Sequence, residues 1–196
     1  MRLRRVMAGR TVWLASASPR RRAILRACGI RHGTIEHSLH EPAPHGPDWR
    51  AWVRTWARRK AAHAARAIAG GWVIGSDTIV VSGGKGLGKP KDKAEAQAML
   101  RRLSGRTHRV YSGVAIVDAG TGKSGAGSSC TQVCFRPLAD HEIAHYVRTG
   151  EPLDKAGAYA IQGGARAFVT SIDGPLDGVI GLPIGTLVQI AGRLSW

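Results

Sequence analysis

The stretch WVIGSDTIVV, residues 72–81, is the clearest β-strand signal in the chain. Asp77 lies inside it, between two apolar runs rich in β-branched residues. Because burial of an unpaired charge is very costly, we expect Asp77 to be paired, to bind a metal or to lie at a bulge opened by Gly75. A structural salt bridge would also explain it, but the hydroxyls of Ser76 and Thr78 beside the carboxylate favour a functional site.

The sequence before residue 72 predicts one more strand and two helices. Residues 11–14 form a short apolar run, and residues 20–28 show helical apolar spacing that ends at Gly29. A loop rich in Pro, His and Gly follows at 40–48, and residues 49–69 have helical character. Strands and helices therefore mix in the first part of the chain.

The SPRR turn before the first of these helices indicates anion binding. Ser18 is a natural N-cap and Pro19 suits the first helical position, which places Arg20 and Arg21 in the first turn. Two cations at the positive end of a helix dipole are unfavourable unless an anion binds there. Solvated arginines on an exposed turn are the alternative.

The segment after residue 81 continues the mixture of strands and helices. The pattern predicts a Gly-rich turn at 82–88, a helix at 93–103, a hairpin of strands 111–118 and 131–136 around a flexible Gly/Ser-rich loop at 119–129, a helix at 140–149, a strand at 167–172 and a helix at 182–191. The turn is not a Walker A loop, because GKP stands where GK[ST] would supply a magnesium-binding hydroxyl. We therefore predict an α/β fold, a single domain with a twisted mixed β-sheet flanked by helices.

The segment GEPLDKAGAYAIQG, residues 150–163, has too little aliphatic bulk for a core stripe and indicates a ligand site. Glycines let the backbone approach a ligand closely. Glu151, Asp154, Lys155 and Gln162 supply the donors and acceptors that a polar, phosphorylated molecule requires.

Length and composition favour one globular domain. The chain has 196 residues, enough to bury a core, and contains no apolar run of the roughly 20 residues needed to span a bilayer. Residues 1–10 are basic with no apolar stretch after them, so we interpret them as an N-terminal extension, whose order is left open, before a domain at 11–196. We expect a cytoplasmic protein with no membrane partner. The three cysteines have no CxxC spacing and indicate neither disulfides nor a zinc site.

The formal net charge of +16 predicts attraction to polyanions such as nucleic acid or nucleotides. The basic residues are scattered, whereas a nucleic-acid arm would be a dense run or one stripe. Compositional bias of the source genome is therefore the favoured explanation, and nucleic-acid binding is the alternative.

Six blocks of the sequence, LASASPRR, VIGSDTIVV, LGKPKD, LRRLSGRTH, GEPLDKAGAYAIQG and GLP, together resemble the Maf family of nucleotide pyrophosphatases. The resemblance spans nearly the whole chain, with the blocks in family order and at family spacing. It implies a Maf/ITPase-like fold and a cytoplasmic, often dimeric enzyme. Such an enzyme hydrolyses nucleoside triphosphates to the monophosphate and pyrophosphate with a divalent metal, Mg or Mn.

The resemblance also implies roles for individual residues. The family's proton acceptor matches Asp77, which would activate or orient water for attack at the α-phosphorus, directly or through the metal. Its phosphate-binding cations match Arg21, Lys60 and Lys89, which would neutralise charge on the pyrophosphate leaving group. Ser16 could hydrogen-bond a phosphate oxygen.

A second acidic position of the family, a metal ligand beside Asp77, matches Glu41. The positions linked to base selection match Arg20, Thr78 and Gln162, a set that resembles the subgroup acting on dTTP and UTP. A side-chain amide such as that of Gln162 can donate and accept together, which suits the imide edge of thymine or uracil, although it could also serve other bases.

Two departures from the family pattern stand out. Thr55 begins a Thr-Trp-Ala stretch where the family tends to have Arg-Leu-Ala, so one cation is absent. Gly178 stands where the family has Asn, and the loss of that amide could weaken ligand binding or loop order. Neither change removes a catalytic group, so activity is expected. The rival hypothesis is a nucleic-acid-binding or division-regulating protein with a vestigial nucleotide site.

Overall fold

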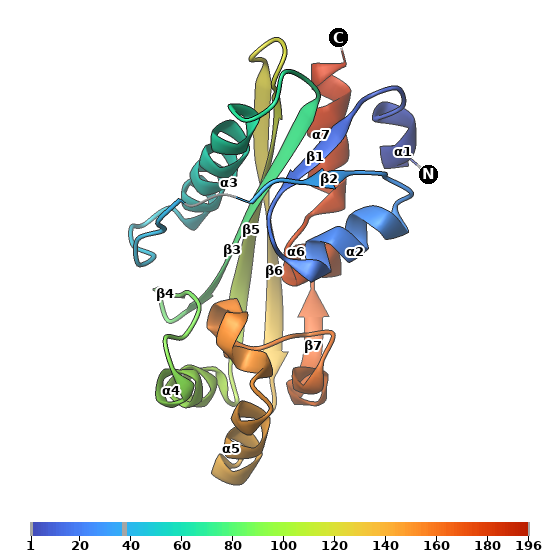
Figure 1. Cartoon of the computed structure of the whole chain (residues 1–196). Coiled ribbons are helices and arrows are strands. Elements are labelled where there is room, and N and C mark those ends of the chain that lie inside the picture. The colour runs from blue at the N-terminus through green and yellow to red at the C-terminus, as the bar shows by residue number, and fades with distance from the viewer. Residues whose placement is uncertain (1, 37–38, 196) are drawn as a thin grey trace.

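A seven-stranded mixed sheet forms the centre of the molecule in the computed structural model, which describes residues 2–36 and 39–195 (Figure 1). Its strands are β1 (Val12–Ala15), β2 (Gly33–Thr34), β3 (Trp72–Ser82), β4 (Lys85–Leu87), β5 (Thr107–Asp118), β6 (Ser124–Phe135) and β7 (Val169–Asp173). The strand order is β2-β1-β3-β5-β6-β7, with β4 paired to β3 as well. The contacts of β1 with β2 and β3 are parallel and the others antiparallel, which confirms the predicted α/β fold with a mixed sheet.

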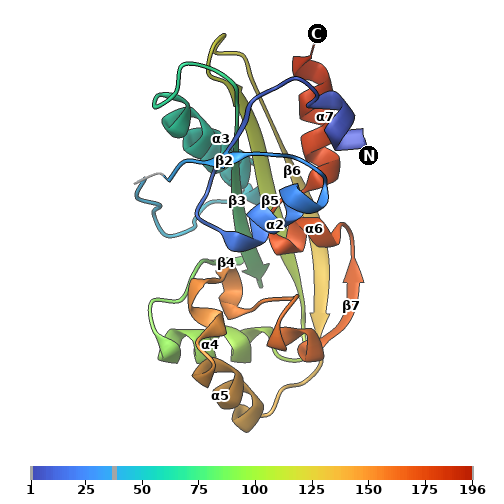
Figure 2. The same cartoon turned by 45° about the vertical axis from the view of Figure 1, so that its right-hand side comes forward.

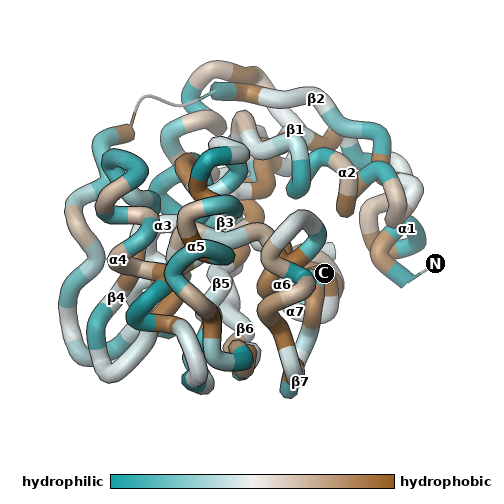
Figure 3. Tube along the Cα trace, turned by 90° about the horizontal axis from the view of Figure 1, so that it is seen from below, coloured by the Kyte–Doolittle hydropathy of each residue, from teal (hydrophilic) through white to brown (hydrophobic). Residues whose placement is uncertain are grey.

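Helices cover both faces of this sheet. They are α1 (Arg2–Val6), α2 (Pro19–Ala27), α3 (Trp49–Ala65), α4 (Lys93–Leu103), α5 (Asp140–Arg148), α6 (Leu176–Ile180) and α7 (Ile184–Leu194), with short 3-10 helices η1 (Glu151–Asp154), η2 (Ala156–Ala158) and η3 (Gly164–Phe168). Figures 1 and 3 show α3 and α7 on opposite sides of β3, β5 and β6. Figure 2 shows α4 and α5 at the lower end of the long strands, away from α2, α3 and α7.

The N-terminal segment, whose order the sequence left open, contains the helix α1. Leu3 and Met7 are buried with Leu187 and Ile190 of α7 in one hydrophobic cluster. Burial of two apolar side chains contributes a few kcal/mol, enough to hold so short a helix on the domain.

The β5–β6 hairpin corrects one prediction. Residues 124–129 belong to β6 and pair with β5, so the loop predicted at 119–129 is confined to 119–123. The Gly/Ser content has a packing cause, because α7 lies directly on this strand. A Cβ at Gly127 would lie 2.4 Å from Cγ2 of Thr186, and one at Gly125 would lie 2.8 Å from Cγ2 of Ile190. Glycine here therefore marks a close helix contact and not a turn.

Two glycines let α3 approach the other face of the sheet. A Cβ at Gly75 would lie 2.2 Å from the carbonyl oxygen of Ala57, and a Cβ at Gly113 would lie 2.1 Å from that of Val53. Both contacts are too short for any side chain, so the backbone of α3 rests on bare strand backbone. We call this contact the glycine seam. Since β3 pairs with β5 in unbroken register through Gly75, the bulge considered for this position is absent.

None of the helices among the described residues combines the length and apolar character that crossing a membrane requires. Cys28, Cys130 and Cys134 are free thiols in the structure.

Candidate active site

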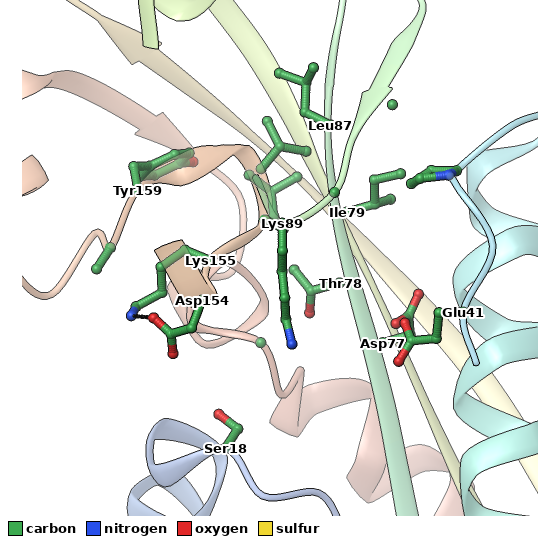
Figure 4. Close-up of a pocket in the computed structure, with 18 of the residues that line it drawn as sticks. Ser18, Glu41, Asp77, Thr78, Ile79, Leu87, Lys89, Asp154, Lys155 and Tyr159 are labelled. Carbon is green, nitrogen blue, oxygen red and sulfur yellow. Dashed lines mark hydrogen bonds and ion pairs between the residues drawn. The ribbon is translucent and has the colours of Figure 1, made fainter. Parts of the chain in front are cut away.

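A cavity of about 1130 Å³ opens beside β3, large enough for a nucleotide-sized ligand (Figure 4). Its position follows from the strand pairing. β1 pairs with β3 only as far as Gly75, and β4 begins its pairing with β3 at Val80. Residues 76–79 therefore have no strand on this edge, and side chains from both faces of β3 reach the cavity. Asp77 and Thr78, which point to opposite faces, both line it.

Nearly every residue that the sequence singled out lines this one cavity. These are Ser16, Arg20, Arg21, Glu41, Lys60, Asp77, Thr78, Lys89, Asp154, Lys155 and Gln162. Glu151 and Ser76 do not line it. Segments more than 100 residues apart in the chain therefore meet at the bare edge of β3.

A three-membered charge cluster lies on the α3 side of the strand. Lys60 Nζ is 2.7 Å from Asp77 Oδ1 and 2.7 Å from Glu41 Oε1. Lys60 and Asp77 are buried, and the Glu41 side chain is 43% exposed. The glycine seam accounts for this contact, because it brings the helix turn that carries Lys60 onto Asp77. The sequence left ion pairing, metal binding and a bulge as alternatives for Asp77, and the structure shows an ion pair with Lys60.

The two carboxylates of this cluster differ in acidity. Burial raises the pKa of Asp77, and the charge of Lys60 opposes that effect only in part. Burial also acts to raise the pKa of Glu41, but the charge and hydrogen bond of Lys60 outweigh it, so the pKa of Glu41 is lowered. Of the two carboxylates, Asp77 therefore holds a proton more readily, and it is the better base of the two when ionised.

The cluster provides two carboxylate groups for a cation. Lys60 contacts Oδ1 of Asp77 and Oε1 of Glu41, which leaves the second oxygen of each carboxylate outside that ion pair. Carboxylate oxygens are the ligands that Mg²⁺ and Mn²⁺ prefer, so this donor set fits such an ion with further ligands from solvent or substrate. Within residues 2–36 and 39–195, no group of three or more His, Cys, Asp and Glu residues is placed to hold a metal.

Arg21 is held rigidly at the start of α2. The helix begins as predicted, with Ser18 as N-cap and Pro19 in the first turn. Arg21 Nε donates to the Gly181 carbonyl at 2.9 Å, and Nη1 donates to Ser16 Oγ at 3.2 Å. These bonds exclude the freely solvated arginine that was the alternative at this position. The guanidinium is instead fixed on the cavity wall, where an anion could meet it.

Arg20 connects α2 with the segment at 150–163. Its Nη1 lies 3.6 Å from Oδ2 of Asp154, whose carboxylate also pairs with Lys155. The Asp154 side chain is 61% exposed, so this ion pair adds little stability. It joins the two sides of the cavity at its rim.

Lys89 has no ion-pair or hydrogen-bond partner in the part of the chain that the structure describes, and Figure 4 shows it extending across the cavity between the Asp77–Glu41 side and the Asp154–Lys155 side. Gln162 is exposed at the cavity wall. Both side chains are therefore available to a ligand.

Glu151, outside the cavity, supports the 150–163 segment. Its Oε2 accepts a hydrogen bond from the Gly164 N–H at 3.0 Å, and its backbone carbonyl accepts from Lys155 Nζ at 3.0 Å. The structure therefore gives Glu151 a supporting position outside the cavity, and its role as a site residue stays a prediction.

The two departures from the family pattern have different positions. Thr55 is exposed on α3 and does not line the cavity, so the missing cation concerns the surface. Gly178 is buried in α6, where its carbonyl accepts a hydrogen bond from Ser112 Oγ at 2.6 Å. A Cβ at residue 178 would lie 2.6 Å from Ser129 Oγ, a buried hydroxyl that has no partner among the described residues.

The sequence interpretation missed two residues that line or support the cavity. Ser112 is fully buried on β5 directly opposite Thr78, and Tyr159 lines the cavity with its hydroxyl 2.9 Å from His108 Nε2. For Ser112, the available signal was a hydroxyl residue beside a glycine inside an apolar strand, much as Ser76 lies beside Gly75.

Comparisons with known proteins agree on one family. A family model described as "Maf-like protein" matches residues 11–194. A dTTP/UTP pyrophosphatase of Pelotomaculum thermopropionicum is 43% identical over 93% of this chain and 96% of the relative. Proteins of the same description from Geobacter sulfurreducens and Symbiobacterium thermophilum are 44% and 47% identical, over 95% and 93% of this chain and 97% and 93% of the relatives.

Proposed function

The chain belongs to the Maf family, and from this premise we propose that it is a nucleoside triphosphate pyrophosphatase that hydrolyses dTTP and UTP to the monophosphate and pyrophosphate. The observation that carries the proposal is the pairing of a buried, weakly acidic carboxylate with a cationic cavity wall. Asp77 lies on one side of the bare edge of β3, and Arg21 and Lys89 line the same cavity.

The reaction needs a base and a place for negative charge. Water attacks the α-phosphorus, its proton passes to Asp77, and the bond from the α-phosphorus to the bridging oxygen breaks as pyrophosphate leaves. The charge that develops on the leaving group is met by Arg21, which is already fixed, and by Lys89, which is free to reach it. Lys60 contacts Asp77 and so influences its protonation. We propose that Lys60 also contacts a phosphate oxygen of the substrate.

We propose that Glu41 and Asp77 hold a divalent cation, Mg²⁺ or Mn²⁺. Bound there, such an ion would supply charge neutralisation for the phosphates and acidify a water molecule. The proposal rests on the two carboxylates, each with one oxygen outside the Lys60 ion pair. We also propose a cytoplasmic homodimer, on the family resemblance alone.

The substitution Asp77→Asn tests the assignment of the base. It keeps the size and the Lys60 contact but removes the proton acceptor, so pyrophosphate release from UTP and dTTP should fall by at least about 100-fold. Circular dichroism and the thermal midpoint should show a folded protein. The matched control is Asp173→Asn, which removes an exposed carboxylate from β7 of the same sheet and should leave turnover unchanged. Retained turnover in Asp77→Asn would assign the base elsewhere.

A further inference from the structure

We infer that Ser112 fixes the hydrogen-bonding polarity of Thr78, so that the cavity presents a lone pair to the nucleobase and selects bases with an N–H donor at that point. The inference deepens the proposed function and rests on it for the placement of the base near Thr78. Ser112 does not line the cavity, so it acts as a positioning residue through Thr78.

The two hydroxyls face each other across paired strands. Thr78 of β3 and Ser112 of β5 are register partners, and their oxygens are 2.8 Å apart. Ser112 is completely buried, while Thr78 is half-buried and points into the cavity (Figure 4). Ser112 therefore contacts Thr78 from the protein side only.

Counting protons fixes the direction of this bond. Ser112 has one hydroxyl proton, and its oxygen lies 2.6 Å from the carbonyl oxygen of Gly178, which can only accept. The proton of Ser112 is therefore used on Gly178. The contact between the two hydroxyls can then be a hydrogen bond only if Thr78 donates to Ser112.

Arg21 confirms this order from the other end. Its Nη2 lies 3.4 Å from Thr78 Oγ1 and can only donate, so Thr78 accepts there. A one-way chain runs from Arg21 through Thr78 and Ser112 to the Gly178 carbonyl. With its single proton directed at Ser112, Thr78 offers the cavity only its remaining lone pair.

An acceptor at this position distinguishes among pyrimidines. The N3 atom of uracil and thymine carries a proton and can donate to Thr78. The N3 atom of cytosine carries a lone pair, so two acceptors would face each other and a polar contact would stay unsatisfied. If Thr78 were free to turn its proton, it could serve both bases equally.

A neighbouring serine provides the matched control. Ser76 is also fully buried on β3, and its hydroxyl lies 2.8 Å from the carbonyls of Gly113 and Gly181. It belongs to the same polar layer but has no hydrogen bond to Thr78 among the described residues. Removal of its hydroxyl perturbs the layer without releasing the Thr78 proton.

The test measures binding and selectivity together. The α,β-methylene analogues of UTP and CTP, which are not cleaved at that bond, are titrated by calorimetry into wild type, Ser112→Ala, Ser112→Cys, Ser112→Thr and Ser76→Ala. We expect the wild type to bind the UTP analogue more tightly than the CTP analogue. In Ser112→Ala and Ser112→Cys, the ratio of the two dissociation constants should fall roughly tenfold, because one satisfied polar contact is worth about that factor. Ser76→Ala should keep the ratio, and Ser112→Thr, which restores a hydroxyl, should recover it. Ser112→Cys is included because it preserves volume if the alanine variant is unstable.

Two results would overturn the inference, namely an unchanged ratio in both Ser112→Ala and Ser112→Cys, or equal binding of the two analogues by the wild type. Pyrophosphate release from UTP is followed separately. Its absence from a wild type that prefers the UTP analogue would refute the proposed function but support the polarity assigned to Thr78.

Discussion

Lys60 contacts both Asp77 and Glu41, so this one residue influences the acidity of both carboxylates of the charge cluster. Lys60 lowers the pKa of both carboxylates, because its ammonium group favours their charged forms, and at Asp77 it only partly offsets the effect of burial. Removing that charge should therefore raise the pKa of Asp77 further, because the largest effect that opposes burial is then lost and only the charge of Arg21 still opposes it. A base must be ionised to accept a proton, so the loss of Lys60 should be felt most at low pH.

Substitution of Lys60→Gln should move the acidic limb of the pH–rate profile to higher pH and reduce turnover at neutral pH by about tenfold or more. Initial rates of pyrophosphate release between pH 5 and 9 measure it, with Lys123→Gln, an exposed residue of the hairpin loop, as the control. A uniform fall in rate with an unmoved acidic limb would instead assign Lys60 to the phosphate groups.

At the scale of elements, the docking of α3 on the sheet depends on the glycine seam. The substitution Gly113→Ala places a Cβ against the carbonyl of Val53, which cannot move without the helix, so we expect a loss of about 1–3 kcal/mol in the free energy of unfolding. The matched control is Gly120→Ala in the hairpin loop, where the Cβ would meet its nearest atom at 3.5 Å and should be tolerated. Urea unfolding compares the two variants with the wild type. An unchanged free energy of unfolding in Gly113→Ala would show that α3 can shift away from the sheet without cost.

The contact between β5 and the segment that carries Tyr159 predicts sensitivity to acid. His108 is buried against Tyr159 and Phe135, and burial lowers its pKa to about 4. An unfolded histidine titrates near 6.5, so the unfolded chain takes up the proton first. The stabilisation is complete above about pH 6.5 and is lost as the pH falls towards 4, by about 3 kcal/mol at most.

The variant His108→Phe isolates this effect from the other titrating groups. Between pH 7 and pH 4.5, the free energy of unfolding should fall less for His108→Phe than for the wild type. Urea unfolding at each pH measures this difference. Parallel pH dependence in the two proteins would mean that His108 is protonated without cost in the folded state.

Local signals in the sequence were sufficient for the longer helices and strands and for several cavity residues, whereas the roles of Glu41, Lys60 and Lys89 came from the family resemblance. The N-cap at Ser18 and the strand around Asp77 were predicted correctly, because capping and apolar runs act over a few residues. The partner of Asp77, the role of Ser112 and the extent of β6 were not, because each depends on which distant segment packs there. Gly127 illustrates the difficulty, since a glycine under α7 and a glycine in a turn look alike in the sequence.

At the scale of the whole molecule, the net charge of +16 is spread over opposite sides. Exposed arginines lie on α1, at Arg4 and Arg5, and on α3, at Arg54 and Arg58, and Figure 1 shows these helices on opposite sides of the sheet. Such a distribution gives general attraction to polyanions without a stripe that follows one nucleic-acid strand.

We therefore expect single-stranded DNA to bind only weakly and to be released as salt rises from 50 to about 200 mM, because counterion release dominates non-specific binding. Fluorescence anisotropy with a labelled oligonucleotide measures this, and UTP turnover followed over the same salt range shows whether the cavity is affected. Tight binding that survives high salt, together with absent turnover, would support the rival nucleic-acid-binding hypothesis.

The glycine seam has a practical consequence for anyone who handles this protein. One helix, α3, packs a hydrophobic cluster against the sheet and also carries Lys60, and it rests on the strand that carries Asp77. Detachment of α3 from the sheet would separate Lys60 from Asp77. Heat inactivation and loss of compactness should therefore coincide, and a simple turnover assay can serve as a quality-control gauge for storage, purification and library screening.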